Sequence, residues 1–479
     1  MASTIIDDLP THIEMQLTKS LNEVLAKENL ITIDEDLSLH RVKVLTMLNN
    51  LFKEWTREVS MVRDLPNIIK YNVGGLFCTF GSYRLGVHHK DDDIDVIIIV
   101  PRHITRVDYF STFYNKLKKN PAIRYVRAIE TAFVPVIKMV ILGIEIDMLF
   151  ASLDLKEVDK NINLERDDLL RNLNAKCVRS LNGCRVANSI LRLVPNRKTF
   201  QKTLIVIKLW AKRKRVYSSI LGYLGGISWA ILVARICQLY PNSTPVTLVR
   251  NFFVIFSKWD WRQPVLLQPL YRVDLGYPVW DSKTNKSDST HVMPIITPVY
   301  PQQNSTYNVS KSTLNIVRKE FKTSLNIITR GIIAGEFNWT TFFQPSKFFT
   351  KYKYFLSIIV LAKCDEDLFE WRGFVKSKLR FLPVFLERDA CVRKSHLNPD
   401  QFVLPAEMSQ GKPSSVWFIG LETTKCNGKN ANLDLSTHIR DFCLLLIRTR
   451  TKARDGMEIQ VNHLKQKDLK DYVPNELNN

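Results

Sequence analysis

The sequence predicts a multidomain protein of mixed α+β class, and three observations lead to that prediction. A chain of 479 residues is too long for one hydrophobic core, so two or three domains are expected. Two groups of β-rich runs occupy residues 76–100 and 134–150. Helical patterns follow, and from about residue 343 strand and helix candidates alternate.

The N-terminal segment predicts two helices, at residues 11–29 and 38–60. In the second, apolar residues recur at spacings of three and four, which places them on one helical stripe. The stripe consists of Leu45, Leu48, Leu51, Phe52, Trp55 and Val59. We expect it to belong to the core, and we assign it no chemistry.

Residues 80–100 contain the pattern that most strongly indicates a functional site, and we expect the rest of the chain to support it. An apolar run leads into Gly81-Ser82, and a β-branched run at 96–100 indicates a strand buried on both faces. Asp93 and Asp95 are two residues apart, so an extended chain places both carboxylates on one face. A cation between them relieves their repulsion, and oxygen ligands suit Mg²⁺. The Gly-Ser turn offers N–H groups and a hydroxyl to a phosphate.

Acidic residues at a strand entrance are more often solvated, and a Gly-Ser pair alone indicates little. Gly-Ser, a ten-residue spacer and Asp-Ile-Asp entering a buried strand form a more specific combination, which favours nucleotidyl transfer. Asp91 and Asp92, at the end of the spacer, are interpreted as solvated turn residues.

A second hairpin is predicted from the runs 134–142 and 144–150, with Gly143 as the turn, and it is expected to join the same sheet. Asp147 lies in the otherwise apolar second run, where an unpaired carboxylate is costly. It is either a surface residue on an edge strand or a third metal ligand, and the upstream Asp-Ile-Asp favours the ligand. Lys138 is either a solvated edge lysine or a contact to phosphate or base.

The middle of the chain reads as helical and basic. Residues 108–119 predict a helix over the sheet, and the first domain boundary is expected within 176–200. Residues 200–240 predict two helices interrupted at Gly222, Gly225 and Gly226, glycines that suit a close approach to an anion.

Five cations lie in the first of these two helices: Lys208, Lys212, Arg213, Lys214 and Arg215. They allow a nuclear-localisation patch, a solvated face or a phosphate-binding surface, and the neighbouring Trp210 and Tyr217 favour the phosphate surface.

The C-terminal third predicts a loop, a helix and then a small α+β sandwich. The loop covers 261–310 and the helix 312–321. Strand or helix candidates occur at 352–362, 380–387, 415–422 and 442–448. Residues 371–382 predict an amphipathic basic helix, whose aromatic residues beside cations suit RNA.

The charge of the chain is divided unevenly. Residues 1–189 hold 25 basic and 25 acidic residues, residues 190–345 hold 21 and 6, and residues 346–479 hold 22 and 16, which accounts for the net +21. A neutral part joined to basic parts fits an enzyme with a polyanionic substrate. Because neither a secretory signal nor an apolar run of membrane length is visible, a soluble intracellular protein without a membrane partner is expected.

Several strings resemble the eukaryotic nuclear poly(A) polymerases, within the DNA polymerase beta-like nucleotidyltransferase superfamily, over nearly the whole chain. They are FGSYRLGVH with DID and PRH (80–103), VPVIK with GIEIDMLFA (134–151), RSLNGCRV (179–186), IKLWAKRK with VY (207–217), GGISWAILVARICQLYPN (225–242), HVMPIITPVYP (291–301) and WRGFVKSKLR (371–380).

The resemblance implies a nucleotidyltransferase palm at 1–189 with N-terminal helices, a basic helical central domain at 190–345 and an RRM-like RNA-binding domain at 346–479. It implies addition of AMP from ATP to RNA 3′ ends without a template, by a two-metal mechanism in mRNA polyadenylation. Mg²⁺, with Mn²⁺ as a possible substitute, is the implied cofactor. The implied partners are ATP, the RNA 3′ end and cleavage and polyadenylation factors, in the nucleus.

By position, the resemblance also assigns residues. Asp93, Asp95 and Asp147 match the catalytic, metal-binding carboxylates. The matches to nucleotide-binding positions are Phe80, Gly81, Ser82, Lys138, Lys208, Tyr217, Gly225 and Gly226.

The chain departs from the family at three places. The spacer before Asp93 is His89-Lys90-Asp91-Asp92 instead of a small, glycine-containing segment, Ser219 replaces an asparagine, and Leu224 replaces a proline. Because serine is the shorter hydrogen-bonding side chain, adenine selectivity is the property in question. A terminal uridylyltransferase or other noncanonical nucleotidyltransferase, which lacks the RRM-like domain, and an inactive RNA-binding scaffold are the alternatives.

Overall fold

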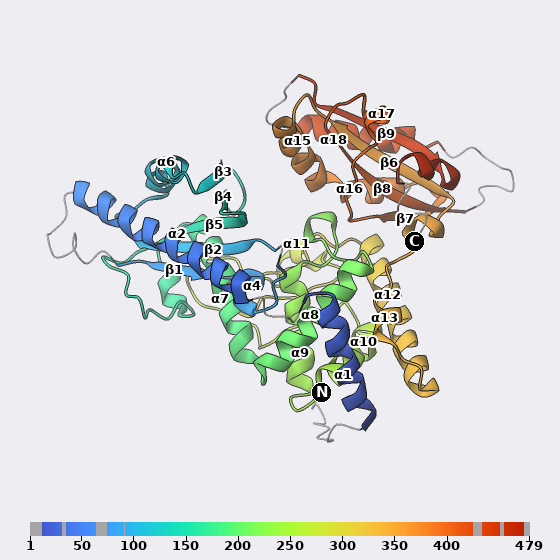
Figure 1. Cartoon of the computed structure of the whole chain (residues 1–479), viewed down its shortest axis with the longest axis horizontal. Coiled ribbons are helices and arrows are strands. Elements are labelled where there is room, and N and C mark those ends of the chain that lie inside the picture. The colour runs from blue at the N-terminus through green and yellow to red at the C-terminus, as the bar shows by residue number, and fades with distance from the viewer. Residues whose placement is uncertain are drawn as a thin grey trace.

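Two β-sheets connected by a helical middle part form the architecture (Figure 1). The computed structural model describes residues 12–30, 35–63, 74–90, 92–424, 434–450 and 455–473. In Figure 1 the N-terminal sheet lies to the left of the central helices, and the C-terminal sheet lies above and to the right of them. The predicted mixed α+β class is confirmed. We call the N-terminal sheet with its covering helices the palm.

The palm sheet has five strands in the order β1-β2-β5-β4-β3. Their bounds are β1 Leu76–Thr79, β2 Ile94–Pro101, β3 Ile123–Ile129, β4 Val136–Ile141 and β5 Ile144–Leu153. Strands β2 and β5 are parallel, and the other neighbours are antiparallel. The predicted second hairpin, β4–β5, therefore joins the first in one sheet. Because β5 is the middle strand, the edge-strand interpretation of Asp147 is wrong.

Both faces of β2 are buried, as its β-branched run predicts. Val96 and Ile98 pack on one face with α2 (Glu35–Val62) and with the helical segment α5 (Arg106–Asp108), η1 (Tyr109–Phe113) and α6 (Tyr114–Lys119). Ile97 and Ile99 pack on the other face with α7 (Ala175–Leu193). The predicted stripe of α2, including Phe52 and Trp55, is core.

Strand β3 was not anticipated from the sequence. Arg124 and Arg127 interrupt its apolar pattern, and a register shift lies between them, where Tyr125 adopts a φ of 53°. A bulge of this kind bends an edge strand and breaks the period-two signal.

The central part is a helical core around Trp210. Its ring packs edge-on against Trp229 and Phe253 and stacks on Phe321. The contributing helices are α8 (Arg197–Arg213), α9 (Gly226–Leu239), α10 (Pro245–Lys258), α12 (Lys311–Ala334) and α13 (Trp339–Phe342). The two helices predicted at 200–240 are present as α8 and α9.

Helix α1 (His12–Lys27) also packs on this core, against α10 and α13. Its Leu21 and Leu25 are fully buried there, and Trp339 Nε1 donates to the Leu17 carbonyl at 3.0 Å. The N-terminal helix thus reaches the central part and bypasses the palm sheet.

The C-terminal sheet has the order β7-β8-β6-β9, with all neighbours antiparallel. Its strands are β6 Tyr354–Leu361, β7 Val392–Leu397, β8 Ser414–Thr423 and β9 Glu458–Lys465, and its main helices are α15 Asp365–Lys378, α16 Phe381–Leu386 and α18 Ser436–Thr449. The strand–helix sequence β-α-β-β-α-β is RRM-like, as predicted. The candidates at 380–387 and 442–448 are helical, and β7 and β9 were not anticipated.

Both faces of this sheet are covered. Trp417 and Ile419 pack toward α15, α16 and α18, whereas Phe355 and Phe418 pack under Phe348 and Phe349 of α14 (Phe348–Lys351). Trp371 of α15 is also core, at 4% exposure. Phe355, Trp417 and Phe418 of the sheet therefore serve packing, whereas Tyr354 at the start of β6 is exposed.

Short elements complete the described residues: η2 Asp167–Leu170, η3 Ser219–Leu221, α11 Lys286–Ser289, α17 Ala406–Ser409 and η4 Gln466–Asp471. Only α11 interrupts the predicted loop 261–310 as a helix. Cys391 is disulfide-bonded. Among the described residues, no helix combines the length and the apolar character needed to cross a membrane.

Candidate active site

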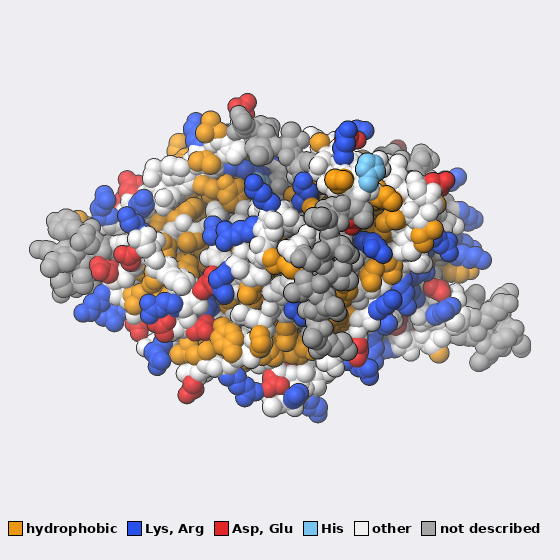
Figure 2. Space-filling model, turned by 90° about the horizontal axis from the view of Figure 1, so that it is seen from below, with side chains coloured by type: hydrophobic (Ala, Val, Ile, Leu, Met, Phe, Trp, Pro, Cys, Tyr) orange, Lys and Arg blue, Asp and Glu red, His pale blue; other side chains and the backbone are white. Residues whose placement is uncertain are grey.

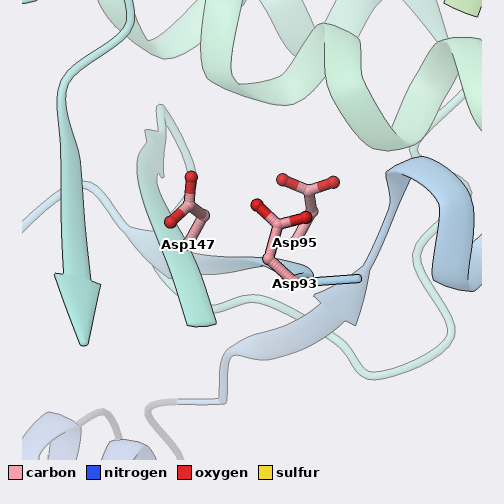
Figure 3. A group of neighbouring side chains, drawn as sticks. All are labelled: Asp93, Asp95 and Asp147. Atoms are coloured by element: carbon pink, nitrogen blue, oxygen red, sulfur yellow. The ribbon is translucent and has the colours of Figure 1, made fainter. Parts of the chain in front are cut away.

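Three carboxylates converge on the palm sheet. Asp93 directly precedes β2, Asp95 lies within it, and Asp147 is the register partner of Asp95 on the parallel strand β5. One oxygen of each lies within 4.8 Å of the other two. Figure 3 shows all three side chains pointing into the same space beside the strands. The i, i+2 spacing and the second hairpin thus bring together the predicted group.

The electrostatics of this group favour a bound cation. Burial, and then the charges of Asp93 and Asp147, raise the pKa of Asp95 to about 7. Burial, and then Asp147, raise the pKa of Asp93. Each carboxylate disfavours ionisation of the next, and a divalent cation removes that penalty. Clustered oxygen ligands suit Mg²⁺ or Mn²⁺, so the residues present fit such a metal.

Asp147 has a second neighbour on the other side. Lys138 is its register partner on β4, and the lysine ammonium forms a salt bridge with the Asp147 carboxylate. Lys138 therefore lies at the edge of the carboxylate group, where it partly neutralises Asp147.

A cavity of about 410 Å³ adjoins Asp93 and Asp95 between the palm and the central helices. This volume lies in the usual range for small-molecule sites. The lining residues are Gly81, Ser82, Leu85, Val87, Asp92, Asp93, Asp95, Leu204, Lys208, Lys212, Tyr217, Gly226 and Ile227.

The predicted Gly81-Ser82 turn is the start of a short helix, α4 (Gly81–Leu85). Gly81 has a φ of 61°, and a Cβ atom added there would lie 2.1 Å from Asp95 Oδ2. Only glycine combines this backbone conformation with that contact. Phe80 lies behind the cavity, and its ring packs against Gly183 of α7. A Cβ atom added at Gly183 would lie 2.8 Å from the Phe80 ring, so only glycine fits at that position.

The five cations of residues 208–215 do not form one surface. Lys208 and Lys212 line the cavity. Arg213 pairs with Glu28 of α1 at 2.7 Å, Lys214 donates to the Gln344 carbonyl at 2.7 Å, and Arg215 pairs with Asp400 at 2.6 Å. Within α8, Lys212 and Arg213 point to different sides because adjacent residues of a helix do not share a face. Lys214 and Arg215 lie beyond the end of α8, where Arg215 has a φ of 58°.

Asp92 is not a solvated turn residue, and that interpretation is wrong. Its carboxylate lies 3.6 Å from Lys208 Nζ and 3.7 Å from Lys212 Nζ. Burial raises the pKa of Asp92, but the His89 N–H and the two lysines outweigh it and hold the pKa below its usual value. Asp91 lies outside the described residues.

Tyr217 and Gly226 belong to the opposite wall, and the neighbouring Gly225 does not line the cavity. A Cβ atom on Gly226 would lie 2.9 Å from Tyr217 Oη, and one on Gly225 would lie 3.0 Å from the Ser219 Cβ. Burial raises the pKa of Tyr217 to about 12, so its hydroxyl stays a hydrogen-bond donor at neutral pH. The Ser219 carbonyl accepts a hydrogen bond from Asn308 Nδ2 at 3.0 Å.

Arg41 is a positioning residue that the sequence did not reveal. From α2, its buried Nη2 donates to the carbonyls of His89 at 2.9 Å and Lys90 at 2.8 Å. It lies about fifty residues upstream, and neither spacing nor composition marks it.

Comparison with known proteins decides the family. Three poly(A) polymerase domain models match the chain: the nucleotidyltransferase domain at residues 1–194, the central domain at 199–345, and the predicted RNA binding domain at 347–413 and 405–479. The chain belongs to the poly(A) polymerase family. The family expected from the sequence motifs is thereby confirmed.

Curated poly(A) polymerases are similar over nearly the whole chain. The "Poly(A) polymerase" of Dictyostelium discoideum is 40% identical over 476 residues, which is 98% of this chain and 58% of that protein. "Nuclear poly(A) polymerase 1" of Arabidopsis thaliana is 38% identical over 468 residues, covering 97% of this chain and 64% of that protein. The chain thus spans about three fifths of these poly(A) polymerases. A solved structure of Cid1 in complex with its short product ApU aligns at a TM-score of 0.49 and 16% identity, over 69% of this chain and 99% of that one.

Proposed function

We propose that this chain is a polynucleotide adenylyltransferase that adds AMP from ATP to RNA 3′ ends without a template. The 3′-oxygen attacks the α-phosphorus of ATP, the bond from that phosphorus to the β-phosphate oxygen breaks, and pyrophosphate leaves. The observation that carries the proposal is the group of three carboxylates beside a cavity that presents Gly81, Ser82 and Lys208. The chain's membership of the poly(A) polymerase family supports the choice of reaction.

Asp93, Asp95 and Asp147 are the proposed catalytic, metal-binding residues. They would hold two Mg²⁺ ions, or Mn²⁺ in their place, and the bound metals would polarise the attacking and leaving oxygens. Lys138 forms a salt bridge with Asp147. Once Asp147 binds a metal, we assign Lys138 a contact to the nucleotide or the primer end.

The cavity residues are assigned to ATP. Lys208 and Lys212 offer cations to the triphosphate, and Ser82 offers its hydroxyl. Tyr217 offers a ring against the base and a protonated hydroxyl. At Gly225 and Gly226 the absence of side chains lets the backbone approach the nucleotide, and Phe80 supports this wall from behind.

RNA is the proposed second substrate. The palm and the C-terminal part meet where the Arg127 guanidinium lies 5.2 Å from the ring centroid of Phe369 on α15. The Arg372 guanidinium lies 4.9 Å from the centroid of the same ring. Arginine beside an exposed aromatic ring suits stacked bases and phosphates. On the face seen in Figure 2, most acidic side chains lie toward the left and basic ones predominate toward the right, in keeping with the uneven charge of the sequence.

The proposed setting is mRNA 3′-end polyadenylation in the nucleus, with cleavage and polyadenylation factors as partners. It is supported by the relatives, two of which are named nuclear poly(A) polymerases.

Metal affinity is expected to depend on pH near neutrality. Only the ionised carboxylate binds a cation, and the pKa of Asp95 is raised to about 7. Mg²⁺ affinity should therefore fall as pH decreases from 8 to 6, by about tenfold per unit below 7. Titration of Mn²⁺ followed by electron paramagnetic resonance measures this, and a pH-independent affinity would contradict the assignment of Asp95.

Primer extension with ATP, UTP, CTP and GTP supplied separately tests the function. With one RNA primer and Mg²⁺, ATP should be incorporated at least about tenfold faster than any other nucleotide. Preferential UTP incorporation would support the uridylyltransferase alternative. It would also indicate that Ser219, in place of the family's asparagine, changes nucleotide selectivity. Failure of every nucleotide with both Mg²⁺ and Mn²⁺ would support an RNA-binding scaffold.

A further inference from the structure

The phosphate-facing lysines of the cavity are already occupied by an anion of the chain itself. The Asp92 carboxylate lies 3.6 Å from the ammonium of Lys208 and 3.7 Å from that of Lys212, one oxygen toward each lysine. All three residues line the cavity. A carboxylate that bridges two lysines within a ligand cavity occupies the place where an anionic ligand group would lie.

Asp92 is held in this position from behind. The backbone N–H of His89 donates to Asp92 Oδ2 at 3.0 Å, which leaves the same oxygen toward Lys208. Arg41 Nη2 fixes the segment further, since it donates to the carbonyl of Asp92 at 3.3 Å as well as to those of His89 and Lys90. The turn is therefore built with its carboxylate aimed at the lysines.

Lys208 is strongly restricted by its surroundings. Its side chain is 10% exposed, and its ammonium also donates to the Val87 carbonyl at 2.8 Å. Lys212 is more exposed, at 51%, and its ammonium also lies 5.8 Å from the ring centroid of Tyr217. Because Lys208 is nearly buried, its ion pair with Asp92 is weakly screened by solvent. That ion pair therefore strongly affects the affinity of Lys208 for another anion.

We propose that Asp92 is an intramolecular counter-anion for Lys208 and Lys212 in the cavity. The nucleotide triphosphate must displace it, so Asp92 weakens nucleotide binding. This inference rests on the proposed function, since it takes the triphosphate of ATP as the competing anion. Asp92 acts here as an affinity-determining residue, separate from the three carboxylates that hold the metals.

The direction of the effect follows from charge. The entering triphosphate carries several negative charges, and Asp92 repels it in addition to the three carboxylates of the metal site. It must also break two ion pairs before it reaches the lysines. Replacing the carboxylate by a neutral isostere removes both penalties and keeps an oxygen for the His89 N–H.

Asp92→Asn is the test, with isothermal titration of inorganic tripolyphosphate, a non-hydrolysable ATP analogue and adenosine into the full chain with Mg²⁺ present. Tripolyphosphate and the ATP analogue should each bind about tenfold more tightly to the variant, and tenfold corresponds to about 1.4 kcal/mol. Adenosine, which lacks phosphates, should bind the variant and the original chain equally.

Glu145→Gln is the matched control. Glu145 is an exposed acid whose charge also influences Asp93, but it does not line the cavity. This variant should leave tripolyphosphate affinity within about twofold. An equal gain in both variants would show a general field effect and overturn the proposal, as would unchanged or weaker tripolyphosphate binding in Asp92→Asn.

A second variant and the choice of readout keep the test decisive. Asp92→Ser also removes the charge and retains a hydrogen-bond acceptor for the turn. If the melting temperature shows that Asp92→Asn folds poorly, the serine variant replaces it in the titrations. Binding requires neither RNA nor turnover. If primer extension fails while the variant binds tripolyphosphate more tightly, the proposed reaction is wrong and the counter-anion stands.

Discussion

Asp95→Asn is expected to abolish AMP incorporation, with a loss of about a thousandfold or more. Asp95 is more deeply buried than Asp93, and it lies between the strand neighbour Asp147 and the preceding Asp93. An amide of the same shape cannot supply the second anionic ligand. Single-turnover primer extension with ATP measures the loss.

The same variant should be at least as stable as the original chain. The folded-state pKa of Asp95 is raised above its ordinary value, so the metal-free folded protein binds this proton more tightly than the unfolded chain does. Between about pH 4 and 7 the group's contribution to the free energy of unfolding falls as pH rises, and above pH 7 the buried charge is destabilising. Asparagine removes that charge, so the melting temperature in EDTA at pH 8 should not decrease.

Asp154→Asn provides the control for Asp95→Asn. Asp154 follows β5 directly, is exposed, and pairs with Arg102 at 3.5 Å. Its replacement should leave primer extension unchanged, and fluorescence anisotropy should show unchanged RNA binding for both variants. Near-normal incorporation by Asp95→Asn would refute the assignment of the carboxylates.

Gly81→Ala should reduce activity by about a hundredfold or more through one added methyl group. The φ of 61° disfavours any L side chain, and the new Cβ would meet the Asp95 carboxylate at 2.1 Å. The carboxylate or the start of α4 has to move, and misplacement of a reacting group by about 1 Å costs about a hundredfold. The value of kcat/KM for ATP in primer extension measures this effect.

Gly143→Ala distinguishes the effect of backbone strain from the effect of the steric clash with Asp95. Gly143 also has a positive φ, 87°, but its Cβ would meet no atom within 4 Å. Both variants should lose about 1–2 kcal/mol of stability from the left-handed conformation, measured by chemical denaturation. Only Gly81→Ala should lose activity. Comparable activity losses in the two variants would contradict the steric explanation.

Local sequence determined the elements whose signals are contained in a few residues. The β-branched run after Asp95 is buried on both faces because no polar residue interrupts it between Val96 and Val100. The i, i+2 acids and the hairpin carrying Asp147 formed the expected group. Strand β3 was missed because its bulge breaks the alternation that marks a strand.

Long-range packing decided which charges act at the site. The five cations of residues 208–215 are equivalent by composition, yet only Lys208 and Lys212 reach the cavity. Arg213 pairs with Glu28 of α1, Lys214 donates to the Gln344 carbonyl of the central part, and Arg215 pairs with Asp400 of the C-terminal part. In the same way, Trp371 is an RNA-binding candidate by pattern and a core residue by position.

By itself the sequence determined the family, the mixed α+β class and the grouping of three carboxylates whose catalytic role stays a proposal, because motifs, hydrophobic runs and strand periodicity are local properties. Only the tertiary structure decided that α1 packs on the central helices, that Arg41 fixes the spacer, and that Asp92 bridges two lysines. Each of these contacts joins segments far apart in the chain, and the register that brings them together is set by packing, which no local pattern records.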